Sequence, residues 1–356
     1  MSHRDREQMW ITLQRLHLVE GTLPAARELE SPWYVKILLA VSGWIASLFL
    51  LGFLAMAWTA IVDNETVAFF AGAILIAISY AILRTPKNEF VEHLALAISL
   101  AGQALAVYGI FSFTGEHNSQ SWLWLVLMEA ALVAVMPNFI HRVFSSFVAG
   151  LAFFIGLFLS GWSLGAGGAL MVGVAWCWLN EFSYPKQMRA IQAVGYGLIL
   201  SLITLKSMEL SGYRAIDWLG YYQVRTLALP WVGELLTSAA VLYVVWELLR
   251  RYKLPISGLP ALLALAGSVA VCGLSLEVHG LTVGMMLIVL GFSCSNRLLL
   301  GLGIVSLVAL ISSYYYLLEQ TLLVKSCSLF ATGLTLLILR WCMVHVLPEK
   351  KEEKHV

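Results

Sequence analysis

Long apolar runs, separated by short polar stretches, follow one another along the chain from residue 37 to residue 347. A helix needs about 20 apolar residues to cross the hydrocarbon core of a bilayer, and several runs are somewhat shorter than that. Backbone N–H and C=O groups cannot stay unpaired in lipid, so each run is predicted to be an α-helix. The predicted runs cover residues 37–61, 66–83, 92–113, 121–136, 143–160, 164–180, 189–206, 230–249, 258–276, 280–294, 298–318 and 326–347. The pattern predicts an all-α fold, a polytopic integral membrane helical bundle of about twelve transmembrane helices.

The turn between the runs 143–160 and 164–180 leaves one alternative open. It is rich in glycine, with Gly161, Gly165 and Gly167 close together. Glycine can join two spanning helices, but it can also break helices that enter and leave the membrane on the same side. The helix count in this region therefore stays open.

The composition supports a membrane protein. The chain is 60% hydrophobic and only 12% charged, with a mean hydropathy of +0.82. Soluble domains are roughly 45–50% apolar and about 25% charged. The net charge of +1 provides no broad basic surface, so nucleic acid is not an expected partner. The expected environment is the lipid bilayer.

Lysine and arginine predict the orientation. If the N-terminus is cytosolic, eighteen of the 22 Lys and Arg residues fall on the cytosolic side. Cytosolic loops carry an excess of these residues, so both ends of the chain are predicted to lie inside, with an even number of helices. The predicted parts are a cytosolic or interfacial amphipathic segment 1–31, a transmembrane domain 32–347 with an outer loop 207–229, and a cytosolic tail 348–356.

Glu129 is the strongest candidate for a functional residue. It lies near the middle of the fourth apolar run, where an ionised carboxylate is costly and needs a partner or a proton. Gln103 lies at similar depth in the third run, and we expect it to hydrogen-bond Glu129. The pair could be a protonatable site in an ion or solute path, or a protonated Glu–Gln pair that locks two helices and contributes about 1 kcal/mol. The eight histidines all fall at predicted run ends, loops or tails, so no histidine is expected beside Glu129.

The predicted outer face carries a candidate docking surface. The outer loop combines aromatic and charged residues, and the turn of the last hairpin adds others, although these could equally stabilise the hairpin itself. The candidate docking residues are Tyr213, Asp217, Trp218, Tyr222, Arg225, Tyr316, Glu319 and Lys325.

Two further charge pairs are compatible with the sequence. Glu247 and Arg340 lie at the same predicted inner depth, where they could form a pair or extend separately to the interface. Lys206 and Glu209 could pair at the outer surface, where an ion pair is solvated and weak.

The sequence offers no clear motif for enzyme chemistry. It contains no Walker loop and no HExxH, and its histidines and five cysteines show no metal-ligand spacing. A GxSxG spacing occurs at Gly161 to Gly165, but it lies between two apolar runs and not between a strand and a helix, where that motif carries chemistry. We therefore expect no catalytic residue, no metal and no cofactor. Gly280 and Gly284 form a GxxxG pattern, which predicts close helix packing.

The last hairpin carries a family resemblance. Its YYYxxExTLLxKS run, Tyr314 to Ser326, and the Ser31-Pro32-Trp33-Tyr34 start of the first run resemble a bacterial inner-membrane family known as domain of unknown function 4401. Members are often encoded beside a second membrane protein with a GDYXXLXY motif. The resemblance implies a multi-pass protein of the bacterial cytoplasmic membrane with a possible neighbouring partner, and no known activity.

Two functions are compatible with these observations. The first is a non-enzymatic subunit or scaffold that acts with another envelope protein, such as one of the GDYXXLXY type. The alternative is a transporter or channel for a small solute or ion, with Glu129 in its path. The sequence leaves the substrate, the partner and the oligomeric state open.

Overall fold

The computed structural model describes most of the chain. It covers residues 10–16, 21, 38, 41, 42, 45, 49, 64–84, 89–115, 118–162, 164–210, 230–255, 257–276, 278, 280–317 and 321–346. The predicted first run, 37–61, and the outer loop therefore lie almost entirely outside the described residues.

Within these ranges the regular structure is helical, and no strand occurs. The α-helices are α3 (Glu65–Arg84), α4 (Glu89–Thr114), α5 (Ser119–Val135), α6 (Phe139–Leu159), α7 (Leu164–Asn180), α8 (Met188–Leu210), α10 (Pro230–Arg251), α11 (Leu259–Ser275), α12 (Leu281–Ser293), α13 (Arg297–Leu317) and α14 (Leu322–Val346). Two 3₁₀ turns, η1 (Glu181–Ser183) and η2 (Pro185–Gln187), join α7 to α8. Each predicted apolar run from 66–83 onward coincides with one of these α-helices.

Several helices match the dimensions of a membrane. In the described part of the chain, six are long and apolar enough to cross one. They are α3, α4, α6, α8, α10 and α13. The 13 residues of α12 reach only about 20 Å, which is less than the roughly 30 Å hydrocarbon core. The number of helices that cross the membrane and their orientation therefore stay predictions.

The glycine-rich turn after α6 does not break a helix. Both α6 and α7 are continuous, and Gly165 and Gly167 lie within the first turns of α7. Residues 160–163 alone connect the two helices. Two helices joined by a short turn are compatible both with two spanning helices and with a re-entrant pair, so the number of crossings in this region stays open.

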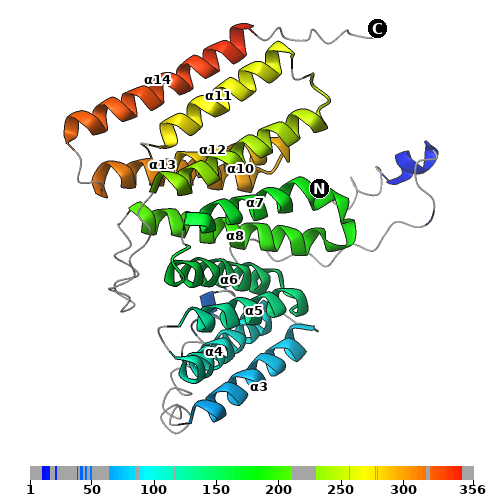
Figure 1. The fold of residues 1–356 in the computed structure, drawn as a ribbon. Helices are drawn as coiled ribbons and strands as arrows, with labels where there is room; N and C mark the ends of the chain where they lie inside the picture. The colour runs from blue at the N-terminus through cyan, green and yellow to red at the C-terminus, as the bar shows by residue number, and fades with distance from the viewer. Residues whose placement is uncertain are drawn as a thin grey trace.

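The helices stack from α3 at one end of the bundle to α14 at the other, with α7 and α8 between them (Figure 1). Neighbours along the stack pack in pairs, including α3 with α4, α5 with α6, α6 with α8 and α12 with α13. The largest apolar core lies in the middle, where Phe154, Met171, Trp178, Ile199 and Met286 are buried. In a membrane, such side chains hold helices together mainly by close van der Waals packing.

Small residues allow the closest approaches between helices. A Cβ atom on Gly284 of α12 would lie 2.8 Å from the side chain of Leu307 on α13, and one on Gly280 would lie 3.0 Å from Leu310. The prediction that this GxxxG pattern marks close helix packing is confirmed. Gly280 also has a φ of 90°, a conformation that favours glycine at the start of α12.

Candidate functional site

Glu129 is deeply buried in α5. Its exposed fraction is 1%, and the side chain of Ser145, on the neighbouring helix α6, hydrogen-bonds its carboxyl group. The second carboxyl oxygen, Oε2, has no hydrogen-bond partner among the described residues. An unpaired buried oxygen of this kind costs about 1–3 kcal/mol.

His141 lies next to this pair and is also 1% exposed. Helix α6 begins at Phe139, and its cap residue Asn138 accepts the backbone N–H of His141 at 2.9 Å. This start places His141 in the first turn. Ser145 lies one turn further along, and its Oγ is 3.4 Å from Nδ1 of His141.

The other ring nitrogen of His141 faces α4. Its Nε2 lies 2.7 Å from Oγ of Ser99 and 3.0 Å from the amide nitrogen of Gln103. An amide nitrogen only donates, so with this amide orientation Nε2 is the acceptor and Nδ1 carries the proton. Nδ1 then donates to Ser145, whose hydroxyl is left to donate to Glu129. We call Ser99, Gln103, His141, Ser145 and Glu129 the polar chain.

The polar chain corrects two expectations. Gln103 is joined to Glu129 through His141 and Ser145, where the sequence predicted direct contact. The prediction that no histidine lies beside Glu129 is wrong, because α6 starts four residues earlier than the apolar run and includes His141. The Pro137-Asn138 pair was the signal for this earlier start, since asparagine is a preferred helix cap.

The polar chain continues toward the predicted cytosolic end of the bundle. Asn138 donates its side-chain N–H to the carboxylate of Glu92, near the start of α4. Glu92 is only half-buried, whereas Glu129 is enclosed. The adjacent Arg142 donates to the backbone carbonyl of Met136 at 2.6 Å and so closes the turn between α5 and α6.

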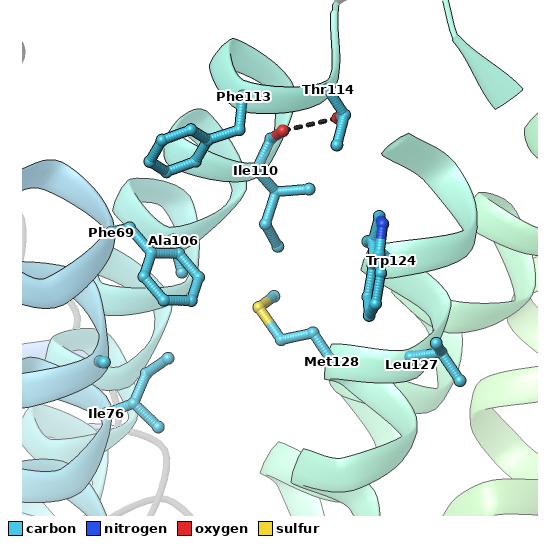
Figure 2. A pocket seen from close by; sticks show the side chains of 10 residues that line it. Phe69, Ile76, Ala106, Ile110, Phe113, Thr114, Trp124, Leu127 and Met128 are labelled. Carbon is cyan, nitrogen blue, oxygen red and sulfur yellow. Dashed lines mark hydrogen bonds between the residues drawn. The ribbon is translucent and has the colours of Figure 1, made fainter. Parts of the chain in front are cut away.

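An apolar pocket lies on another side of α5. It has a volume of about 590 Å³ between α3, α4 and α5, and Phe69, Phe113, Trp124 and Met128 line it (Figure 2). The hydroxyl of Thr114 at its rim already donates to the carbonyl of Ile110 at 2.6 Å. The walls therefore offer mainly apolar contacts.

A comparison with known protein families shows the family to which the chain belongs. The family described as Domain of unknown function (DUF4401) matches residues 32–346. The chain belongs to this family. Searches of curated proteins and of solved structures gave no match. The resemblance inferred from the last hairpin and from the start of the first run is thereby confirmed.

A second charged cluster occupies the middle of the DUF4401 bundle. Nζ of Lys206 on α8 lies 2.7 Å from Oε2 of Glu209 and 2.7 Å from Oε1 of Glu234 on α10. Thr237 donates to the other oxygen of Glu234 at 3.3 Å. The pairing of Lys206 with Glu209 is confirmed, but its predicted solvated character is wrong. Lys206 is 1% exposed, and its second partner, Glu234 of α10, is equally buried.

Glu247 has two local partners at the other end of α10. It lies 3.0 Å from Arg250 and 2.9 Å from Arg251. Arg251 also donates to the carbonyl of Leu179 at the end of α7. The side chain of Arg340 lies outside the described residues, so its pairing with Glu247 stays a prediction.

The candidate docking surface is described only in its last hairpin. Tyr316 is 80% exposed. Lys325 is buried, donates to the carbonyl of Tyr315 at 2.7 Å and lies 5.7 Å from the centre of that ring. Lys325 thus stabilises the hairpin in this DUF4401 chain. The remaining candidates lie outside the described residues: Tyr213, Asp217, Trp218, Tyr222, Arg225 and Glu319.

Proposed function

We propose that this protein is a transporter or channel whose buried carboxyl group, Glu129, takes up and releases the transported or coupled ion. The bacterial cytoplasmic membrane is the proposed location, based on the Lys and Arg distribution and on the family resemblance. The observation that supports this proposal is that Oε2 of Glu129 has no hydrogen-bond partner among the described residues, while Ser145, His141 and Gln103 form a chain of hydrogen-bonding groups beside the carboxyl group.

A purely structural role accounts for this geometry less well. If Glu129 served only to hold two helices together, both of its carboxyl oxygens should accept hydrogen bonds. An unpaired buried oxygen would reduce the stability that such a contact provides. Gln103, the expected partner in such a lock, is instead 3.0 Å from His141. Ionisable residues inside membrane helices are rare and typically mark ion pathways or proton relays.

The test is charge movement across the membrane. The purified protein is reconstituted into vesicles, a membrane potential is imposed, and a voltage-sensitive dye reports its decay in buffers that contain sodium, potassium or neither. We expect the protein to speed the decay and Glu129→Gln to reduce the added rate at least tenfold, since proton transfer by a positioned group typically contributes about 10²–10⁴-fold. Glu65→Gln is the matched control, because Glu65 is an exposed carboxylate in the first turn of α3.

A wild-type rate in Glu129→Gln vesicles would overturn the proposal. It would favour the other function predicted from the sequence, a non-enzymatic subunit that acts with a second membrane protein of the GDYXXLXY type. That function predicts a stoichiometric partner when the tagged chain is purified from its own membrane in mild detergent.

A further inference from the structure

We propose that the apolar pocket between α3, α4 and α5 binds an acyl chain of a membrane lipid. This inference goes beyond the proposed function, because none of the described residues that line the pocket belongs to the polar chain. It assigns a second site in the bundle and the chemical class of its ligand.

The pocket forms because the helices around it pack in two pairs. α3 and α4 approach closely, and an added Cβ atom on Gly72 would lie 2.5 Å from the carbonyl oxygen of Gly102. α5 packs closely against α6 but only lightly against α4. The two pairs therefore leave a space between them, which has a volume of about 590 Å³. This volume lies within the roughly 300–1,000 Å³ of small-molecule sites.

The walls of the pocket are suited to an apolar ligand. The described lining side chains are aliphatic or aromatic, apart from the hydroxyl of Thr114. That hydroxyl already lies 2.6 Å from the carbonyl of Ile110 and 2.6 Å from Oγ of Ser121. A polar solute would lose its hydrogen bonds with water here and gain few in return, whereas a hydrocarbon chain has none to lose. No charged side chain occurs in the described lining, so the pocket should not select a lipid by its headgroup.

The pocket also has the depth and polarity of one leaflet. Phe113 lies just before the turn that joins α4 to α5, and Ala106 lies seven residues deeper in α4, about 10 Å along the helix axis. The hydrocarbon of one leaflet is about 15 Å thick, half of the core. The indole nitrogen of Trp124 lies at the Thr114 end of the pocket (Figure 2), as expected for tryptophan near a membrane interface. A bound chain would therefore have its ester end near Thr114 and its methyl end near Met128.

The pocket opens at the surface of the described bundle. Phe113, Trp124 and Leu127 at its edge are each about half-exposed, and Ala73 of α3 is exposed as well. The bilayer supplies acyl chains at this surface. An empty apolar space would forfeit dispersion contacts, and cavities of this kind take up apolar ligands. A lipid chain is the occupant that satisfies the walls, the depth and the opening together.

The test measures lipid that stays bound after purification. The protein is reconstituted with phospholipids whose acyl chains carry bromine, a short-range quencher of tryptophan fluorescence, and is then purified in a mild detergent without bromine. We expect mass spectrometry to detect retained brominated phospholipid. Trp124→Phe should remove the accompanying quenching, because Trp124 is the tryptophan in the described lining.

Ala73→Phe should lower the retained lipid at least tenfold, because the chain must compete with a phenyl ring for the same apolar space. Ala77→Phe is the matched control. Ala77 is also exposed on α3, one turn further along, but it is not among the described lining residues. Ala77→Phe should therefore retain as much lipid as the unmodified protein.

Equal lipid retention by Ala73→Phe and Ala77→Phe, or quenching that survives Trp124→Phe, would overturn the inference. Equal retention with a loss of thermal stability in Ala73→Phe alone would favour another occupant, such as the predicted run 37–61. Glu129→Gln should keep the lipid. Absence of retained lipid would leave the proposed function standing, and a wild-type rate of charge movement in Glu129→Gln would leave the lipid site standing.

Discussion

Lys206→Met is expected to lower the free energy of unfolding of the bundle by about 3–5 kcal/mol. Removal of one member of a buried ion pair leaves the other charge uncompensated, and this is among the most destabilising single changes in proteins. Glu234 would lose its ammonium partner at 2.7 Å while remaining 1% exposed. The measurement is reversible unfolding in mixed micelles with increasing fractions of denaturing detergent, followed by tryptophan fluorescence.

The double variant Lys206→Met/Glu234→Met and the single variant Arg250→Met serve as controls. Apolar replacement of a whole buried pair is often neutral or stabilising, so the double variant should recover most of the loss. Arg250 also pairs with a glutamate, but its side chain is 65% exposed, and Glu247 keeps Arg251 as a partner. We expect Arg250→Met to cost about 1 kcal/mol or less. Equal losses for Lys206→Met and Arg250→Met would show that the buried cluster is not the reason.

Gly72→Val is expected to destabilise the contact between α3 and α4 by about 1–3 kcal/mol, as overpacking of a close contact does. A Cβ atom on Gly72 would lie 2.5 Å from the carbonyl oxygen of Gly102 and 2.7 Å from the backbone nitrogen of Ala106. Both are backbone atoms and cannot rotate away, so the two helices must separate. The same detergent titration measures the loss.

Gly301→Val on α13 is the matched substitution. Gly301 is also in a helix, but nothing lies within 4 Å of its added Cβ. Valine is at least as good a helix former as glycine, so Gly301→Val should be neutral or slightly stabilising. If the two variants unfold alike, the close approach of α3 and α4 does not limit stability.

The positions of the helices were predictable from the sequence. The apolar runs from residue 66 onward each became a helix, because burial in lipid or in a helical bundle requires apolar side chains and internally paired backbone groups. Helix lengths were less predictable. The run 143–160 lacked the first turn of α6, where His141 and Arg142 are polar although the backbone is already helical.

The sequence predicted some residues of the candidate site but not how they are connected. Glu129 and Gln103 were recognised because a charged or amide side chain deep in an apolar run is costly. Their connection through His141 and Ser145 was missed. Hydropathy weighs each residue by itself and cannot show that a polar residue at the end of a run is covered by a neighbouring helix.

The sequence by itself determined the helical class, the presence of helices long and apolar enough to cross a membrane, and the family, since these depend on composition, on the length of apolar runs and on short motifs. Only the tertiary structure decided which polar groups meet. Lys206 of α8 is buried and pairs with Glu234 of α10, and His141 of α6 joins Gln103 of α4 to Ser145. Such contacts depend on the packing of helices far apart in the chain, which no local pattern of residues specifies.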